Sequence, residues 1–176
     1  RYRQAQIARS AKIDAFVWEK LEAMKREGRP NEEFAFVVHG TMADPRWLDL
    51  SIDANDRKGP NWCFMGEPRI VNMMPAGLAR YTSLRAWLSQ WSYKHSRADG
   101  PKCAGDVTVP VLVVENSADD GCTPSHAARI MAGIKHSDKE FHVVNGATHY
   151  YIGQPEKMAE AVEIVKSWLE KKNLLV

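Results

Sequence analysis

Along the first stretch of the chain, apolar residues recur at the three- and four-residue spacing of one helix face: Ile13, Phe16, Val17, Leu21 and Met24. Gly28 and Pro30 follow this run and supply a stop signal. The pattern therefore predicts one long amphipathic helix over residues 2–27.

Residues 29–77 lack such a period. Four X-Pro pairs interrupt this stretch: Asp44-Pro45, Gly59-Pro60, Glu67-Pro68 and Met74-Pro75. Large apolar side chains are also dense in it: Trp47, Trp62, Phe64, Met65, Met73 and Met74. We expect a long excursion with little regular structure, whose aromatic and methionine side chains need a surface to pack on.

A second helix is predicted over residues 82–92. Leu84, Trp87, Leu88 and Trp91 stand there at helical spacing. Thr82 or Ser83 is the expected cap, because their hydroxyls accept hydrogen bonds from the first free N–H groups of a helix. Gly100, Pro101 and Gly105 then mark a break.

Beyond the break, segments with the pattern of a strand alternate regularly with segments that have the pattern of a helix. Residues 109–114 form a continuous apolar run, typical of a strand buried on both faces of a parallel sheet. A helix is predicted from Pro124, with Thr123 as its cap, then a strand at 141–144 and a helix at 155–172. The apolar stripe of the last helix contains four residues: Met158, Val162, Val165 and Leu169. Strand, helix, strand, helix is the order of a doubly wound parallel sheet.

Composition excludes several classes of protein. The 176 residues include 24 basic and 22 acidic ones, spread along the chain, so nucleic acid is not an expected partner. No apolar run is long enough to span a bilayer. Cys63, Cys103 and Cys122 form no CxxC pair, so we predict neither a disulfide framework nor a zinc site and expect reduced thiols, as in the cytoplasm. Because Arg1 opens inside a helical pattern, we expect the natural N-terminus to lie upstream.

The loops that follow the two predicted strands carry the candidate chemistry. Functional groups in an open parallel sheet gather beyond the carboxyl ends of its strands. Asp119 and Asp120 follow the first strand, and His149 follows the second. A carboxylate that holds one ring nitrogen of a histidine lets the other nitrogen take a proton from a nucleophile. We assign Asp119 and His149 to such a pair.

Simpler roles remain open for several of these residues. Aspartate is common in the turn before a helix, so Asp119 and Asp120 could both have only that role. Asp120 is the second candidate for the acid, or its charge complements the helix dipole. His126 and His136 are expected at the surface, and His142 is expected to be a structural histidine of its strand.

Two segments resemble α/β-hydrolases. PVLVVENSADDGCTPSH (residues 110–126) resembles the penultimate strand and acid loop of that family, with Asp119 at the acid position. NGATHYY (residues 145–151) resembles the histidine loop, with His149 at the catalytic position. The order of acid, histidine and terminal helix also matches the family.

An earlier segment, FAFVVHG (residues 34–40), superficially resembles the strand that builds the oxyanion hole in these enzymes. A glycine-flanked nucleophile of the form GxSxG should then follow before Val109. Five serines in that interval lack such glycines: Ser51, Ser83, Ser89, Ser92 and Ser96. Cys63 and Cys103 have no matching pattern either. We therefore interpret His39 and Gly40 as a turn in a lid, with substrate contact left open.

The resemblance implies an α/β fold in which residues 1–105 form a cap or lid and residues 106–176 form the C-terminal part of an α/β-hydrolase core. It implies hydrolysis of an ester, thioester or amide, with His149 as base and Asp119 as its orienting acid. The serine nucleophile and the oxyanion hole are expected in an N-terminal portion outside this chain, which would be its partner. No metal or organic cofactor is implied, and the apolar lid favours a hydrophobic acyl or aromatic substrate.

Two alternatives stay open. The chain could belong to a binding module that kept the scaffold without catalysis. It could also belong to a hydrolase whose nucleophile is aspartate or cysteine, because the residue at the missing elbow decides the reaction.

Overall fold

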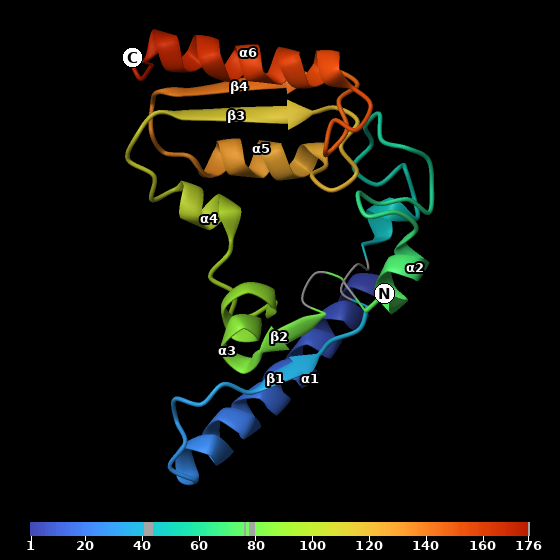
Figure 1. The fold of residues 1–176 in the computed structure, drawn as a ribbon, viewed down its shortest axis with the longest axis vertical. Coiled ribbons are helices and arrows are strands. Elements are labelled where there is room, and N and C mark those ends of the chain that lie inside the picture. The colour runs from blue at the N-terminus through green and yellow to red at the C-terminus, as the bar shows by residue number, and fades with distance from the viewer. Residues whose placement is uncertain (41–43, 76, 78–79, 176) are drawn as a thin grey trace. The chain divides into compact units, whose positions relative to one another are not determined.

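The computed structural model describes residues 1–40, 44–75, 77 and 80–175, and its fold is mixed α/β (Figure 1). The chain forms two compact units. The first comprises Arg1–Ala43 and Arg69–Asp99, and the second comprises Asp44–Pro68 and Gly100–Val176. Within the described ranges, no helix is both long and apolar enough to cross a membrane.

The first unit is built on the long helix α1 (Tyr2–Arg26), which confirms the first predicted element. The antiparallel strands β1 (Ala35–Val37) and β2 (Tyr81–Ser83) pair beside it. β2 leads into α3 (Leu84–Ala86) and η2 (Trp87–Trp91). The core of this unit combines residues of α1, of the chain directly after β1, and of α3 and η2: Val17, Met24, Val38, Leu84 and Trp87.

The predicted helix over residues 82–92 begins later than expected, because Tyr81–Ser83 pairs with β1 as a strand. The Ser83 hydroxyl accepts a hydrogen bond from the N–H of Ala86 at 3.3 Å, so Ser83 rather than Thr82 caps the helix. A short helix, α2 (Pro68–Met73), lies in the stretch predicted to be irregular.

Gly40 supports the interpretation of residues 39 and 40 as a turn. Its φ is 66°, a left-handed value that glycine adopts without strain. The strand before it pairs antiparallel with β2 in a sheet of two strands among the described residues. This pairing differs from that of a central strand in a parallel sheet.

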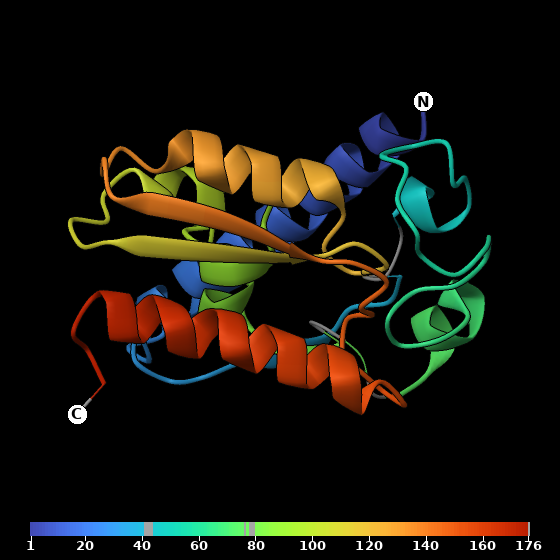
Figure 2. The same ribbon diagram turned by 90° about the horizontal axis from the view of Figure 1, so that it is seen from above.

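The second unit contains the predicted alternation of strands and helices. β3 (Val111–Asn116) and β4 (Lys139–Val144) pair in parallel, from Val111 opposite Lys139 to Asn116 opposite Val144. The strands lie between α5 (Pro124–Gly133) and α6 (Pro155–Lys171) in both views (Figures 1 and 2). The structure thus confirms a parallel strand pair flanked by helices.

Burial of this unit is lower than the sequence predicts. β3 is only half-buried along its length, although its apolar run predicted a strand covered on both faces. Three residues of the predicted inner stripe of α6 are exposed: Met158, Val162 and Val165. The physical reason is the small width of the sheet. A sheet of two strands, as described here, is too narrow to cover one whole face of each flanking helix.

The segment Asp44–Pro68 belongs to the second unit and carries the short η1 (Pro45–Trp47). The region predicted as a cap, residues 1–105, therefore contributes to both units. Its role as a cap stays a prediction. α4 (Gly100–Ala104) begins the remainder of the second unit and packs against α5.

Gly133, the last residue of α5, lies directly against the backbone of α4. A Cβ placed on Gly133 would lie only 2.2 Å from the backbone oxygen of Pro101, an overlap that a rotating side chain cannot relieve. We expect Gly133→Ala to lower the free energy of unfolding by about 1–3 kcal/mol, because the two helices must move apart. Gly59→Ala is the control, since its new Cβ would meet only the Leu50 side chain, at 3.9 Å. Denaturant unfolding of both variants tests this, and equal stability would contradict the packing.

Candidate active site

Asp119 and His149 meet at the edge of the sheet where β3 and β4 end. The Nδ1 of His149 lies 2.9 Å from Oδ1 and 3.0 Å from Oδ2 of Asp119. The Asp119 side chain is 8% exposed and that of His149 is 26% exposed. The carboxylate is thus shielded from water while the imidazole keeps one accessible edge.

The loop after β3 fixes the Asp119 carboxylate by hydrogen bonds from its own backbone. The N–H groups of Gly121 and Cys122 donate to Oδ1 at 2.6 and 2.7 Å. The Asp119 backbone is held as well, because its N–H donates to the carbonyl of Asn116 and its carbonyl accepts from Nδ2 of Asn55. Two such hydrogen bonds on one oxygen hold the carboxylate in one orientation.

Hydrogen bonds join the two loops beyond the strand ends. The Ser117 N–H donates to the carbonyl of Val144, and the Ala118 N–H donates to the carbonyl of Ala147. The side-chain amide of Asn116 donates to the carbonyl of Thr148, one residue before the histidine. These hydrogen bonds extend the parallel pairing beyond the strand ends and hold the loop of His149 beside the loop of Asp119.

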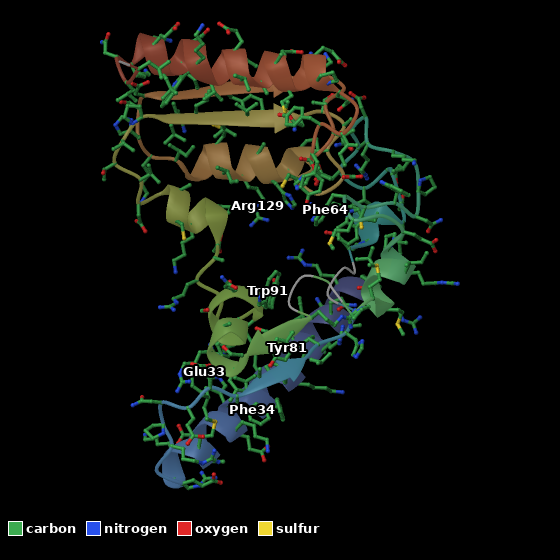
Figure 3. The ribbon with its side chains drawn as sticks, in the orientation of Figure 1. Glu33, Phe34, Phe64, Tyr81, Trp91 and Arg129 are labelled. Carbon is green, nitrogen blue, oxygen red and sulfur yellow. The ribbon has the colours of Figure 1, made fainter. Side chains whose placement is uncertain are left out.

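Aromatic side chains surround the imidazole. Phe64, which lies close to the loops after β3 and β4 in Figure 3, has its ring centroid 4.9 Å from that of His149. The Tyr150 ring stands edge-on at 4.6 Å, and Trp47 packs against Phe64 at 6.2 Å. A Cβ on Gly121 would lie 2.9 Å from Phe64 and 3.1 Å from His149, so glycine leaves room for both rings.

A polar network anchors the segment that carries Trp47 and Phe64. The Asp53 carboxylate accepts hydrogen bonds from the hydroxyls of Thr123 and Ser125 and from the Ser125 N–H at 3.1 Å. Arg46 donates to Thr123 at 2.7 Å and forms ion pairs with Asp44 and Asp53. The indole N–H of Trp47 donates to the carbonyl of Asp120 at 2.5 Å.

Asp120, the second candidate for the acid, does not bond to the imidazole. It is buried, and burial raises the pKa of its carboxyl, with a further increase from the charge of Asp119. The geometry therefore distinguishes two adjacent aspartates that the sequence could not separate.

The other histidines differ from their predicted surroundings in two cases. His126, predicted at the surface, is half-buried with its Nε2 2.8 Å from Arg46, and burial together with the Arg46 charge lowers its pKa. His142, predicted to be a structural residue, is 43% exposed, with Glu140 at 3.9 Å. Neither lies against Asp119, and His136 bonds instead to the backbone of Asp138.

Cys122 is a site residue that the sequence pattern does not single out. Its thiol sulfur, an oxygen of Asp119 and a ring nitrogen of His149 lie within 4.8 Å of one another. Burial raises the pKa of the Cys122 thiol, and the Asp119 charge adds to this effect. One signal in the sequence could have identified Cys122 as a site residue: it stands three residues after Asp119 in the same loop.

Comparisons with protein-family models, curated proteins and solved structures found no match for this chain. The case for a function therefore rests on the residues and their geometry.

Asp53 gives a pH dependence that can be measured. Burial works to raise the pKa of Asp53, but the hydrogen bonds from Ser125 and Thr123 outweigh it and lower the pKa below the ordinary value. A lowered pKa means that the stabilisation is present above the unfolded pKa of about 3.9 and is lost as pH falls through the folded pKa.

We expect Asp53→Asn to lower the free energy of unfolding by about 1–3 kcal/mol at neutral pH, because charged acceptors form stronger hydrogen bonds. The difference from the parent protein should shrink below about pH 4. Asp106→Asn, an exposed position, controls for the change in net charge. A difference that stays constant from neutral pH to pH 3 would show that the Asp53 charge does not anchor the segment.

Proposed function

We propose that this chain is the C-terminal part of an α/β-hydrolase that cleaves an ester, thioester or amide through a serine, histidine and aspartate triad. The observation that carries the proposal is the pairing of Nδ1 of His149 with the shielded carboxylate of Asp119. The resemblance of residues 110–126 and 145–151 to the acid and histidine loops of that family supports it.

Each side chain has a defined task in this reaction. With Nδ1 held by Asp119, the neutral imidazole presents Nε2 as the base that takes the proton of the nucleophile. The imidazolium then gives that proton to the leaving group. Asp119 keeps the ring in place and stabilises its positive charge, while the N–H groups of Gly121 and Cys122 hold its carboxylate in one orientation.

The nucleophile is a serine in a segment outside these 176 residues. Among the described residues, the hydrogen bonds of the His149 ring lead to Asp119 and not to a serine hydroxyl. The Cys122 thiol is close to the pair, but burial raises its pKa, which disfavours the thiolate, the nucleophilic form of cysteine. The oxyanion hole belongs to the same outside segment.

Exposed apolar side chains support a missing neighbour for the sheet. Phe141 and Val143 of β4 are exposed, and so are the α6 residues named above. An apolar strand face and an apolar helix face in water are costly and promote aggregation. The central strands of a hydrolase core, carried by the N-terminal portion of the protein, would cover them.

The surroundings of His149 favour a hydrophobic substrate. Phe64 and Tyr150 lie against the imidazole and against each other, with ring centroids 6.2 Å apart. Apolar walls around a proton-transfer residue exclude water and bind apolar groups. A hydrophobic acyl or aromatic group next to the scissile bond fits this environment.

A fluorophosphonate probe tests for the complete triad in the full-length protein that carries this chain. We expect covalent labelling of one serine outside residues 1–176, because His149 activates it. His149→Gln should abolish labelling, whereas His142→Gln, at an exposed position of β4, should retain it. No labelling of the parent protein would instead favour a binding module without catalysis, and labelling that survives His149→Gln would refute the assignment of the base.

The two adjacent aspartates offer a matched test of the acid. We expect Asp119→Asn to lower kcat for an activated ester by about 10³–10⁴-fold, because an amide at this position can hold the ring in the wrong tautomer. Asp120→Asn should have a far smaller effect, since Asp120 does not bond to the imidazole. Steady-state kinetics of both variants decides, and a larger loss for Asp120→Asn would identify Asp120 as the acid.

A further inference from the structure

Three different metal-binding groups converge at the end of the sheet. A carboxylate oxygen of Asp119, the sulfur of Cys122 and a ring nitrogen of His149 all lie within 4.8 Å of one another. Two of these residues come from the loop after β3 and one from the loop after β4. The hydrogen bonds between the two loops keep these three residues close together without a metal.

Asp119 and His149 already have the spacing of two ligands in a tetrahedral zinc site. Zn–N and Zn–O bonds of about 2.0–2.2 Å and Zn–S bonds of about 2.3 Å place neighbouring ligand atoms roughly 3–4 Å apart. Oδ2 of Asp119 and Nδ1 of His149 are already 3.0 Å apart. Oδ1 accepts the backbone N–H groups of Gly121 and Cys122, which leaves Oδ2 as the oxygen available to a metal.

The chemistry of the donors selects the metal. One thiolate, one imidazole and one carboxylate form a mixed set that suits Zn²⁺, whereas Mg²⁺ and Ca²⁺ prefer oxygen ligands alone. The local charge also suits a cation. Asp120 adds a carboxyl group beside Asp119, and the nearby guanidinium of Arg46 is paired with Asp44 and Asp53.

We propose that Asp119, Cys122 and His149 bind Zn²⁺ at the position of the proton that Asp119 and His149 share, with the fourth coordination position open to water. Binding moves the imidazole proton from Nδ1 to Nε2 and releases the thiol proton to solvent. If the hydrolase proposal holds, the zinc-bound form cannot relay a proton, because both nitrogens are then occupied. Zinc would therefore be a reversible inhibitor.

Cobalt provides the probe, because Co²⁺ takes the same site geometry and absorbs visible light. Titration of the metal-free protein with CoCl₂ should give the strong visible bands of a four-coordinate ion and a thiolate-to-cobalt charge-transfer band. Added ZnCl₂ should abolish both. Cys122→Ser and Cys122→Ala should remove the charge-transfer band, while Asp119→Asn and His149→Gln should weaken cobalt binding at least about tenfold.

Cys103→Ser is the matched control, because Cys103 lies outside the cluster of Asp119, Cys122 and His149. It should leave the spectrum and the affinity unchanged. Circular dichroism of every variant checks that the fold persists. The proposal is overturned if the parent protein shows no charge-transfer band, if the band survives Cys122→Ser, or if His149→Gln binds cobalt as tightly as the parent does. The spectrum requires no turnover, so failure of the hydrolase proposal would leave its result intact.

Discussion

Val111 pairs with Lys139 and Asn116 with Val144, so β3 and β4 run in the same direction and end at the same edge of their sheet. The candidate site depends on this register. A shift by one residue would turn every side chain of one strand to the opposite face and move its loop along the other. With the register fixed, the loop after β3 presents Asp119 and the loop after β4 presents His149 at one height.

A second constraint comes from a segment distant in the sequence. Asp53 binds Thr123 and Ser125 at the entrance of α5, and Trp47 donates to the carbonyl of Asp120. Ordering such an irregular segment costs conformational entropy, which these partly buried hydrogen bonds help to offset. The result is that Phe64 lies on the imidazole. The same segment shields one side of the acid and histidine pair and gives the site its apolar wall.

Part of this arrangement could be predicted from the sequence. The long first helix, the parallel strands, the start of α5 at Pro124 and the meeting of the acid and histidine loops follow from apolar periodicity and from breakers. The anchoring by Asp53 and Arg46 could not be predicted, because single polar residues in an irregular segment carry no periodic signal. The strand at Tyr81–Ser83 was missed because its three residues resemble the cap of the helix that follows. The exposure of Met158 and Val162 depends on the width of the sheet, which periodicity does not report.

The most direct test of the account is the tautomer of His149, measured by ¹⁵N NMR on the metal-free protein at a pH where the imidazole is neutral. We expect a proton on Nδ1, hydrogen-bonded to Asp119, with Nε2 as the unprotonated nitrogen. This preference should weaken in Asp119→Asn. A neutral ring that carries its proton on Nε2, or a tautomer that does not respond to Asp119→Asn, would contradict the central claim that Asp119 prepares His149 to accept a proton.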